Sequence, residues 1–193
     1  MSKIVLFDGT DLSHFTQLDG TPAKWKVENG YMTVEHGNIV SKETYGDAHI
    51  HVEWMEPQMP PEAHGTQWNG NSGVYIQGCY ELQVLDSYGI EPPKDDDCGA
   101  IYGIQAPRVN ACKPALEWQT YDIYLRAARM EDDKVIEPAI VTILQNGQVI
   151  HNNLVLHRHT PGGVYEKVVA EGPLLLQDHG QAVSYRNIWI ETL

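Results

Sequence analysis

The sequence consists of short runs of β-branched and aromatic residues separated by Gly, Pro, Asn and Asp. Two of the breaks are Asn-Gly pairs, at positions 29–30 and 146–147, and this dipeptide favours the tight turn of a β-hairpin. No segment has the 3.6-residue apolar period of an amphipathic helix. The pattern therefore predicts an all-β fold of sandwich type, in which short strands alternate with turns.

The apolar runs place strands at 25–27, 31–35, 48–55, 73–77, 80–86, 118–126, 140–145, 148–151, 174–177 and 182–191. Along 48–55, apolar residues alternate with His49, His51 and Glu53, so the apolar set should face the core and the polar set should face away. Segments 57–71, 91–97 and 130–138 are predicted to be loops. In a sandwich such loops rim one end or cover one sheet face, where ligands usually bind.

The 193 residues fit one domain with a sizeable core, so we expect 1–193 to form a single domain. The formal net charge of −13 gives a surface that repels phosphate backbones and anionic lipids. No run of 18 apolar residues could span a membrane. These properties exclude nucleic acid and membranes as partners and leave uncharged small molecules such as sugars. The oligomeric state stays open.

The N-terminal apolar stretch is far too short for a signal peptide. The protein is therefore either periplasmic or extracellular, with its leader removed and a new start methionine added, or cytoplasmic. Three cysteines, Cys79, Cys98 and Cys112, are too few for a disulfide scaffold. One Cys98–Cys112 bridge and three reduced thiols are the two alternatives.

Residues 80–86 hold the first set of groups that could carry chemistry. Period-2 alternation puts Glu81 and Gln83 on one face of this strand, with Leu82 on the core side. A bulge near Leu85 would bring Asp86 to the same side as Glu81. Two carboxylates and an amide on one face would form a general acid/base set. The alternative is a solvent-facing strand with ordinary acidic residues.

The end of the chain holds the second set. A polar corner, 177–180, separates the last two predicted strands and contains Asp178 and His179, and Arg186 lies on the closing strand. A histidine there can move a proton near neutral pH, and an arginine can stabilise a developing oxyanion. Alternatively, Asp178, His179 and Arg186 form a structural network that holds the last strand in place.

Sugar recognition uses planar amides and flat aromatic faces. Asn71 precedes a strand, Tyr102 follows an isoleucine, and Trp118 is next to Gln119. Turn chemistry for Asn71 and core packing for Trp118 are the structural alternatives. No metal site is predicted, because the paired histidines at 49/51 and 157/159 lack a carboxylate at ligand spacing. The acidic run 95–97 could bind calcium, but a solvated loop is favoured.

Several segments, in order and spanning nearly the whole chain, together resemble the 3-keto-disaccharide hydrolase domain. They are VLFDGTDLSHF, HVEW, NGNSGVYIQGCYELQVLDS, CGAIYGIQAP, EWQTYDI, VTILQNGQVI and GPLLLQDHGQAVSYRNIWIETL. The resemblance implies a concanavalin A-like jelly roll of two antiparallel sheets with a concave surface that faces carbohydrate. It also implies a bacterial origin and, commonly, an exported protein.

The spacing of Glu81, Gln83 and Asp86 is also similar to the catalytic strand of laminarinase-like glycoside hydrolases of the same fold. That family has Glu, Asp and Glu at these places. The middle amide and the shorter last acid in this chain argue against an ordinary retaining double displacement.

The family resemblance implies cleavage of 3-keto-glycosides, since a ketone at C3 acidifies the C2 proton and allows elimination of the aglycone from C1. Either a lyase or net hydrolysis results. The implied roles are Glu81 or His179 as base, Asp86 or His179 as acid, and Arg186 or a divalent cation such as calcium as enolate stabiliser. The residues expected to line and orient the sugar are Glu53, Asn71, Gln83, Tyr102, Trp118 and Gln119. A non-catalytic, lectin-like carbohydrate-binding module and a conventional glycoside hydrolase are the alternatives.

Overall fold

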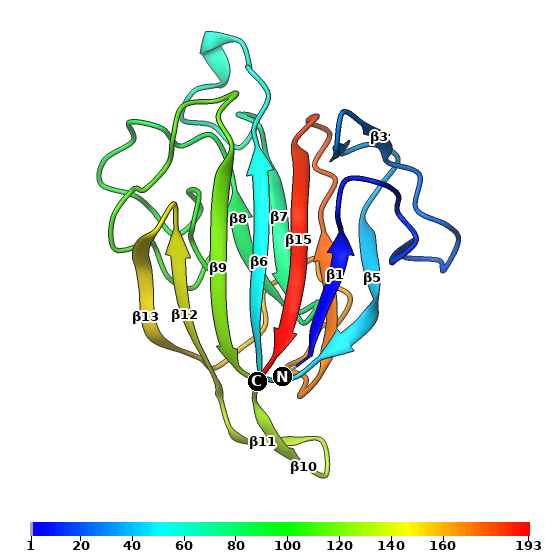
Figure 1. Cartoon of the computed structure of the whole chain (residues 1–193). Coiled ribbons are helices and arrows are strands. Elements are labelled where there is room, and N and C mark those ends of the chain that lie inside the picture. Colours follow the sequence, from blue (N-terminus) through cyan, green and yellow to red (C-terminus); the bar gives the residue numbers. More distant parts are fainter. Residues whose placement is uncertain (1) are drawn as a thin grey trace.

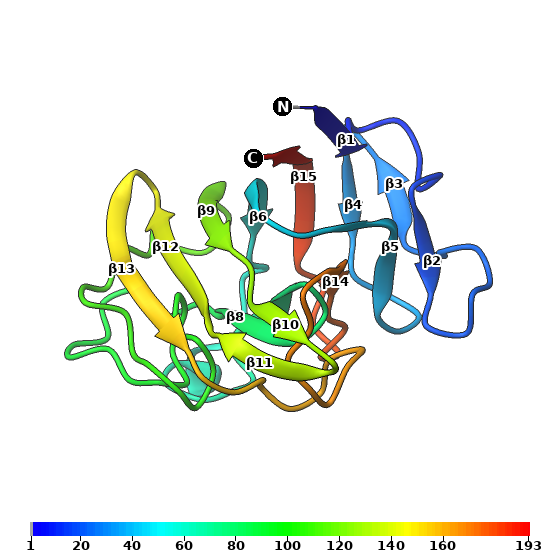
Figure 2. The same cartoon turned by 90° about the horizontal axis from the view of Figure 1, so that it is seen from below.

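The computed structural model describes residues 2–193 and shows a sandwich of two antiparallel sheets, as the sequence predicts (Figure 1). The eight-stranded sheet lies in front in Figure 1, and the five-stranded sheet lies behind it. The view from below in Figure 2 shows the two layers and places both termini beside the paired strands β1 and β15.

The strand order of the larger sheet is β13 (Gln148–Leu156), β12 (Ala139–Gln145), β9 (Gln119–Arg126), β6 (Ala48–Met55), β15 (Ser184–Thr192), β4 (Tyr31–Thr33) and β3 (Lys26–Glu28), with β1 (Lys3–Phe7) also paired to β15. The order of the smaller sheet is β2 (Phe15–Gln17), β5 (Ile39–Tyr45), β14 (Gly172–Leu176), β7 (Ser72–Ile76) and β8 (Tyr80–Val84). A hairpin, β10 (Arg129–Glu131) and β11 (Lys134–Glu137), and a short 3₁₀ helix, Pro61–Ala63, complete the elements.

The core lies between the two sheets. Along β6 the apolar residues are buried and the residues between them are partly exposed, which confirms the predicted alternation. Trp54 of β6 is fully buried and stacks on Tyr121 of β9, with ring centroids 4.0 Å apart. Burial of side chains of this size stabilises the fold by roughly 2 kcal/mol each.

Three strands of the smaller sheet are buried on both faces, because every residue of β7, β8 and β14 is buried. Val74 and Leu82 belong to the core between the sheets. The next cross-strand pair, one residue along each strand, is Tyr75 of β7 and Glu81 of β8. Successive side chains of a strand point to opposite faces, so Tyr75 and Glu81 point to the outer face of the sheet. Loops cover this outer face, and the predicted loop 57–71 is one of them.

The two Asn-Gly turns form as predicted, with positive φ at both residues of each pair: 53° and 80° in the first, 52° and 78° in the second. Residues 130–138 do not form the predicted loop and instead belong largely to the β10–β11 hairpin. Asp132 and Asp133 supply its left-handed turn, with φ of 46° and 60°. All four residues of β11 are exposed, so this strand has no alternating pattern to reveal it. The pattern likewise does not predict β1, β2 and β5.

Cys79, Cys98 and Cys112 are free thiols in the structure, which is the second of the two alternatives considered. Within residues 2–193, no helix has the length and apolar character needed to cross a membrane.

Candidate functional site

A cavity of about 200 Å³ lies on the outer face of the five-stranded sheet, beneath the covering loops. It brings together side chains from β7, β8, loop 57–71, the segment after β14 and two further loops. The lining residues are Gln67, Asn71, Tyr75, Glu81, Gln83, Tyr102, Pro161, Gly162, Gln177 and His179. Among the described residues that line it, none is Lys or Arg, and Glu81 is the one carboxylic acid.

Glu81, the second residue of β8, contributes its carboxyl group. The side chain folds toward Gly73 on the neighbouring strand, where a Cβ atom would lie 2.7 Å from Oε1. A side chain at position 73 would therefore displace the carboxyl group. Glu81 is only 4% exposed, and this burial raises its pKa to about 7 against the opposing effect of Tyr75. An acid with this pKa can both accept and donate a proton near neutral pH.

His179 enters the cavity from the corner that follows β14. Asp178 holds this corner, because its carboxylate accepts hydrogen bonds from the backbone N–H groups of Gly37 (2.7 Å) and Gly180 (2.8 Å). The Nδ1 atom of His179 is buried and has no hydrogen-bond partner within residues 2–193. The ring packs edge-on against Trp68, with centroids 5.7 Å apart, and Trp68 is 63% exposed.

Tyr102 completes the set of groups that can exchange protons in the cavity. Its backbone N–H donates to the carbonyl oxygen of Glu81 at 3.1 Å, which ties its loop to β8. Partial burial and the neighbouring charges of Glu81, Asp96 and Asp95 raise the pKa of its phenol. Tyr102 is therefore a neutral hydroxyl group at physiological pH and can donate a hydrogen bond.

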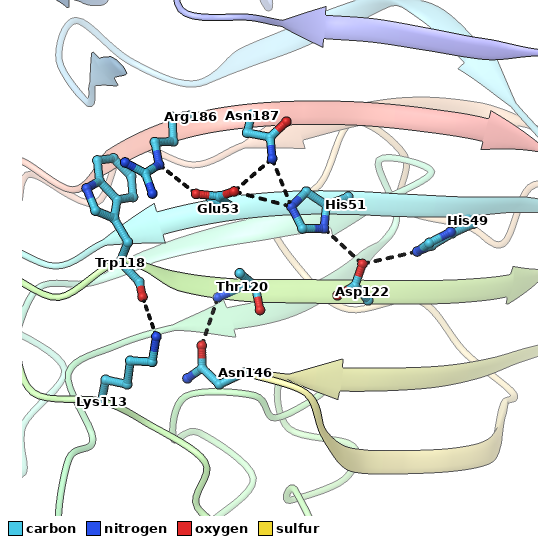
Figure 3. A network of polar contacts seen from close by, with 10 residues as sticks. All are labelled: His49, His51, Glu53, Lys113, Trp118, Thr120, Asp122, Asn146, Arg186 and Asn187. Carbon is cyan, nitrogen blue, oxygen red and sulfur yellow. Dashed lines mark hydrogen bonds and ion pairs between the residues drawn. The ribbon is translucent and has the colours of Figure 1, made fainter. Parts of the chain in front are cut away.

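A second cluster of polar side chains lies on the outer face of the eight-stranded sheet (Figure 3). Glu53 of β6 accepts hydrogen bonds from Arg186 Nε at 2.6 Å and from Asn187 Nδ2 at 2.7 Å. His51 Nδ1 lies 2.8 Å from Asp122 Oδ1 on β9. We call these five residues, together with His49 and Trp118, the sheet network.

The charged side chains of the sheet network form ion pairs with one another. Burial alone would lower the pKa of His51, but Asp122 and Glu53 raise it overall. Contact with His51 lowers the pKa of Asp122. Burial raises the pKa of Glu53, but Asn187 and Arg186 more than offset this and lower it overall. The network therefore holds ionised carboxylates that already have partners.

The sequence profile of the 3-keto-alpha-glucoside-1,2-lyase-like domain matches residues 2–191. The chain belongs to this family. Membership makes the protein a carbohydrate-active enzyme of hydrolase or lyase type. No curated protein sequence matches the chain.

Two solved structures from Parabacteroides distasonis ATCC 8503, both named as candidate glycosyl hydrolases, share the fold of this family member. One is 37% identical with a TM-score of 0.90, and the match covers 99% of this chain and 84% of that chain. The other is 20% identical with a TM-score of 0.70, covering 99% and 94%. The carbohydrate binding module CBM66 from Bacillus subtilis has the same fold at 10% identity, with a TM-score of 0.54 and coverage of 92% and 96%.

The cavity of this family member unites half of the residues singled out in the sequence. Glu81 and Gln83 share a face of β8, as predicted, and the cavity also contains the predicted sugar-binding residues Asn71 and Tyr102 and the predicted proton carrier His179.

Arg186, Glu53 and Trp118 do not reach the cavity, so the expectation that Arg186 shares a pocket with Glu81 is wrong. The register of β15 shifts after Arg186, and Asn187 has a φ of 45°. Arg186 is paired with Glu53 across β15 and β6, so its side chain belongs to the outer face of the eight-stranded sheet, and the bulge brings Asn187 to that same face. The guanidinium of Arg186 lies 4.0 Å from the ring centroid of Trp118. The alternative network of Asp178, His179 and Arg186 is wrong for the same reason.

Asp86 and Gln119 belong neither to the cavity nor to the sheet network. The predicted bulge near Leu85 does not form, because β8 ends at Val84, and the Asp86 carboxylate instead accepts a hydrogen bond from the N–H of Tyr88 at 3.2 Å. Gln119 is completely buried and donates through Nε2 to both carboxyl oxygens of Glu56, at 2.9 and 2.8 Å. Gln119 is thus a core residue rather than a sugar ligand.

Sequence reasoning missed Gln67, Tyr75, Trp68 and Gln177. Tyr75 carried a usable signal, because it alternates with Val74 and Ile76 on a strand paired with β8. The two glutamines and Trp68 lie in loop or corner segments, where no periodic pattern predicts which way a side chain points.

Within residues 2–193, no group of three or more His, Cys, Asp or Glu side chains is arranged to hold a metal ion. The two histidines on β6 both contact Asp122 Oδ1, at 3.1 Å for His49 and 2.8 Å for His51.

The raised pKa of Glu81 predicts a pH-dependent gain in stability for the Glu81→Gln variant. The pKa is about 7 in the folded state against an ordinary value of 4.5, so the folded state binds the proton more tightly. Stability contributed by this group is full below pH 4.5 and is lost as the pH rises to about 7. At about 1.4 kcal/mol per pKa unit, the loss is up to about 3 kcal/mol.

Urea unfolding at pH 5 and pH 8 checks this prediction. Relative to the wild type, Glu81→Gln should gain stability on going from pH 5 to pH 8, because glutamine cannot ionise. The same stability difference at both pH values would show that the Glu81 pKa is not raised.

Proposed function

We propose that the protein cleaves 3-keto-glycosides by removing the C2 proton and eliminating the aglycone from C1. The observation that carries the proposal is Glu81, a buried carboxyl group with a pKa of about 7 that shares a small polar cavity with His179. The description of the family names a reaction on a 3-keto-alpha-glucoside, which supports this substrate class.

The reaction needs a base, an acid and a donor to the ketone oxygen. The base takes the C2 proton, and the C–H electron pair forms an enolate over C2, C3 and the C3 oxygen. The C3 carbonyl then reforms, a C1–C2 double bond forms, and the bond from C1 to the aglycone oxygen breaks. The acid gives its proton to that oxygen. Addition of water across the C1–C2 double bond completes a net hydrolysis, and release of the enone completes a lyase reaction.

We assign the base to Glu81. A carboxylate with an ordinary pKa is a weak base, whereas burial makes ionised Glu81 a stronger one while leaving much of it ionised near neutral pH. Its pairing with Tyr75 of β7, together with its backbone N–H donating to Thr160 Oγ1 at 2.7 Å, fixes the direction of the side chain.

We assign the acid to His179 and the donor to the ketone oxygen to Tyr102. His179 is next to the exposed ring of Trp68, which offers a flat surface for an aglycone at the mouth of the cavity. The neutral phenol of Tyr102 can donate to the oxygen that gains charge in the enolate. These assignments replace Asp86 and Arg186, whose side chains lie elsewhere.

A conventional retaining or inverting glycosidase needs two carboxyl groups flanking the bond that breaks. Among the described residues lining the cavity, Glu81 is the one carboxylic acid, which favours the elimination.

Cleavage of methyl 3-keto-α-glucoside in D₂O tests the mechanism. Removal of the C2 proton predicts that a hydrolysis product carries deuterium at C2, or that a lyase product has no proton at C2 and a vinyl proton at C1, both visible by proton NMR. A product that keeps its original C2 proton would contradict the proposal, because direct displacement at C1 leaves C2 untouched.

A further inference from the structure

Three amide side chains line the cavity with their oxygens unpartnered. Asn71 Oδ1, Gln83 Oε1 and Gln177 Oε1 are each buried and have no hydrogen-bond partner in the part of the chain that the structure describes. Asn71 is 2% exposed and Gln83 is 1% exposed. A buried acceptor without a partner destabilises a protein, so three of them around one cavity indicate a ligand that supplies the missing donors.

Backbone carbonyl groups fix the orientation of Asn71 and of the neighbouring Gln67, which in turn orients Gln83. Asn71 Nδ2 donates to the carbonyl oxygen of Gln67 at 2.9 Å, and Gln67 Nε2 donates to the carbonyl oxygen of Asp96 at 3.0 Å. A carbonyl oxygen can only accept, so neither amide can be reversed. Gln67 Oε1 then accepts from Asn71 Nδ2 and from Gln83 Nε2, both at 3.0 Å. Exchanging the oxygen and nitrogen of the Gln83 amide would place its oxygen against Gln67 Oε1, and two acceptors cannot form a hydrogen bond.

The third amide is fixed by a hydroxyl group. The single hydroxyl proton of Tyr75 has two acceptors near it, the carbonyl oxygen of Pro161 at 3.1 Å and the Glu81 carboxyl group, and donation to either leaves the Tyr75 oxygen to accept from Gln177 Nε2 at 3.3 Å. The nitrogen of Gln177 is therefore occupied by the protein, and its oxygen is the free end.

We infer that these three amide oxygens recognise hydroxyl groups of the sugar as hydrogen-bond donors, with Gln67 as the residue that positions two of them. The inference rests on the proposed function and extends it to substrate specificity. A 3-keto-hexopyranoside keeps hydroxyl groups at C2, C4 and C6, which supplies three donors for three acceptors. The ketone oxygen can only accept, so it must face a donor elsewhere, and Tyr102 offers one.

The acceptor-lined wall also selects against other ligands. An anionic sugar such as a uronic acid would bring a carboxylate to a cavity whose described lining contains no Lys or Arg and does contain Glu81. A group that only accepts hydrogen bonds would leave an amide oxygen unpartnered and would itself be repelled.

Deoxyfluoro sugars test this inference, because fluorine replaces a hydroxyl group at similar size but cannot donate a hydrogen bond. Binding of methyl 3-keto-α-glucoside and of its 4-deoxy-4-fluoro and 6-deoxy-6-fluoro analogues is measured by calorimetry on Glu81→Gln, so that turnover does not interfere. Each analogue should bind at least about tenfold more weakly than the parent, the scale for a buried group left unpaired. The Gln67→Leu substitution, added to Glu81→Gln, should reduce this discrimination to about twofold for the analogue whose fluorine faces Gln83, because the released Gln83 amide can present its N–H group to fluorine. Asn71 keeps its hydrogen bond to the backbone carbonyl of residue 67, so the discrimination that depends on Asn71 should remain.

The outcomes separate the inference from the proposed function. Analogues that bind within about twofold of the parent would overturn recognition by amide oxygens even if the wild type cleaves the parent. If the parent is neither bound nor cleaved, the proposed function fails and this inference fails with it. If Gln67→Leu does not fold, the ligand series alone decides.

Discussion

Replacement of Glu81 by Gln is expected to lower the rate of 3-keto-glycoside cleavage by at least about a hundredfold, the usual scale for loss of a general base. Glutamine has nearly the same shape and keeps the backbone hydrogen bond to Thr160, so the fold should persist. It cannot accept the C2 proton. His179→Ala should lower the rate by a similar factor, because the aglycone would then leave without a proton donor. Initial rates on methyl 3-keto-α-glucoside, with circular dichroism of each variant, measure the effect.

Glu53→Gln is the matched control. It makes the same chemical change on the outer face of the other sheet, where Glu53 pairs with Arg186 and Asn187. Its rate should stay within about twofold of the wild type, as for substitutions away from a functional site. A large loss in Glu53→Gln together with full activity in Glu81→Gln would place the reaction at the sheet network and would refute the assignment to the cavity.

The division of polar residues between two outer faces explains how an acidic chain can present a site with a single carboxyl group among its described lining residues. The sheet network keeps its carboxylates ionised by pairing them with Arg186 and His51. The cavity instead holds one buried acid and several amides, whose polarity does not depend on a counter-charge. A neutral sugar therefore meets directional hydrogen-bond groups together with Glu81 and His179, the two side chains assigned to proton transfer.

Strand alternation made one side of the site predictable. The period of two along β8 correctly placed Glu81 and Gln83 together, and the same period along β6 correctly turned Glu53 away from the core. Regular strands transmit this information because successive side chains point to opposite faces. The polar corner with His179 was also predictable, since a residue between two strands lies at the end of a strand, where loops gather.

The positions of the remaining site residues could not be predicted from the sequence, because they depend on irregular backbone and on contacts between distant segments. Arg186 lies on a strand of the eight-stranded sheet, and no local residue pattern predicts which sheet a strand joins. The bulge after Arg186 also brings Asn187 to the same face as Arg186, against simple alternation. Loops place Gln67 and Trp68 at the cavity through contacts that are distant in sequence, such as Gln67 with Asp96. Amide side chains are common on surfaces, so only the three-dimensional arrangement distinguishes the oriented set at 67, 71, 83 and 177 from ordinary polar residues.

The requirement for the ketone is the second large effect that we expect. The C3 carbonyl acidifies the C2 proton, whereas the parent glycoside lacks it and offers no acidic proton to Glu81. Purified protein should cleave methyl 3-keto-α-glucoside and leave methyl α-glucoside at the background rate. The same assay after chelator treatment tests whether a bound divalent cation contributes to stabilising the enolate.

Comparison of these two substrates in one assay, with the released methanol quantified, tests the central claim most directly. The account predicts methanol from the keto-glycoside alone. Release of methanol from both at similar rates, or from methyl α-glucoside alone, would contradict it, because cleavage would then not depend on an acidic C2 proton.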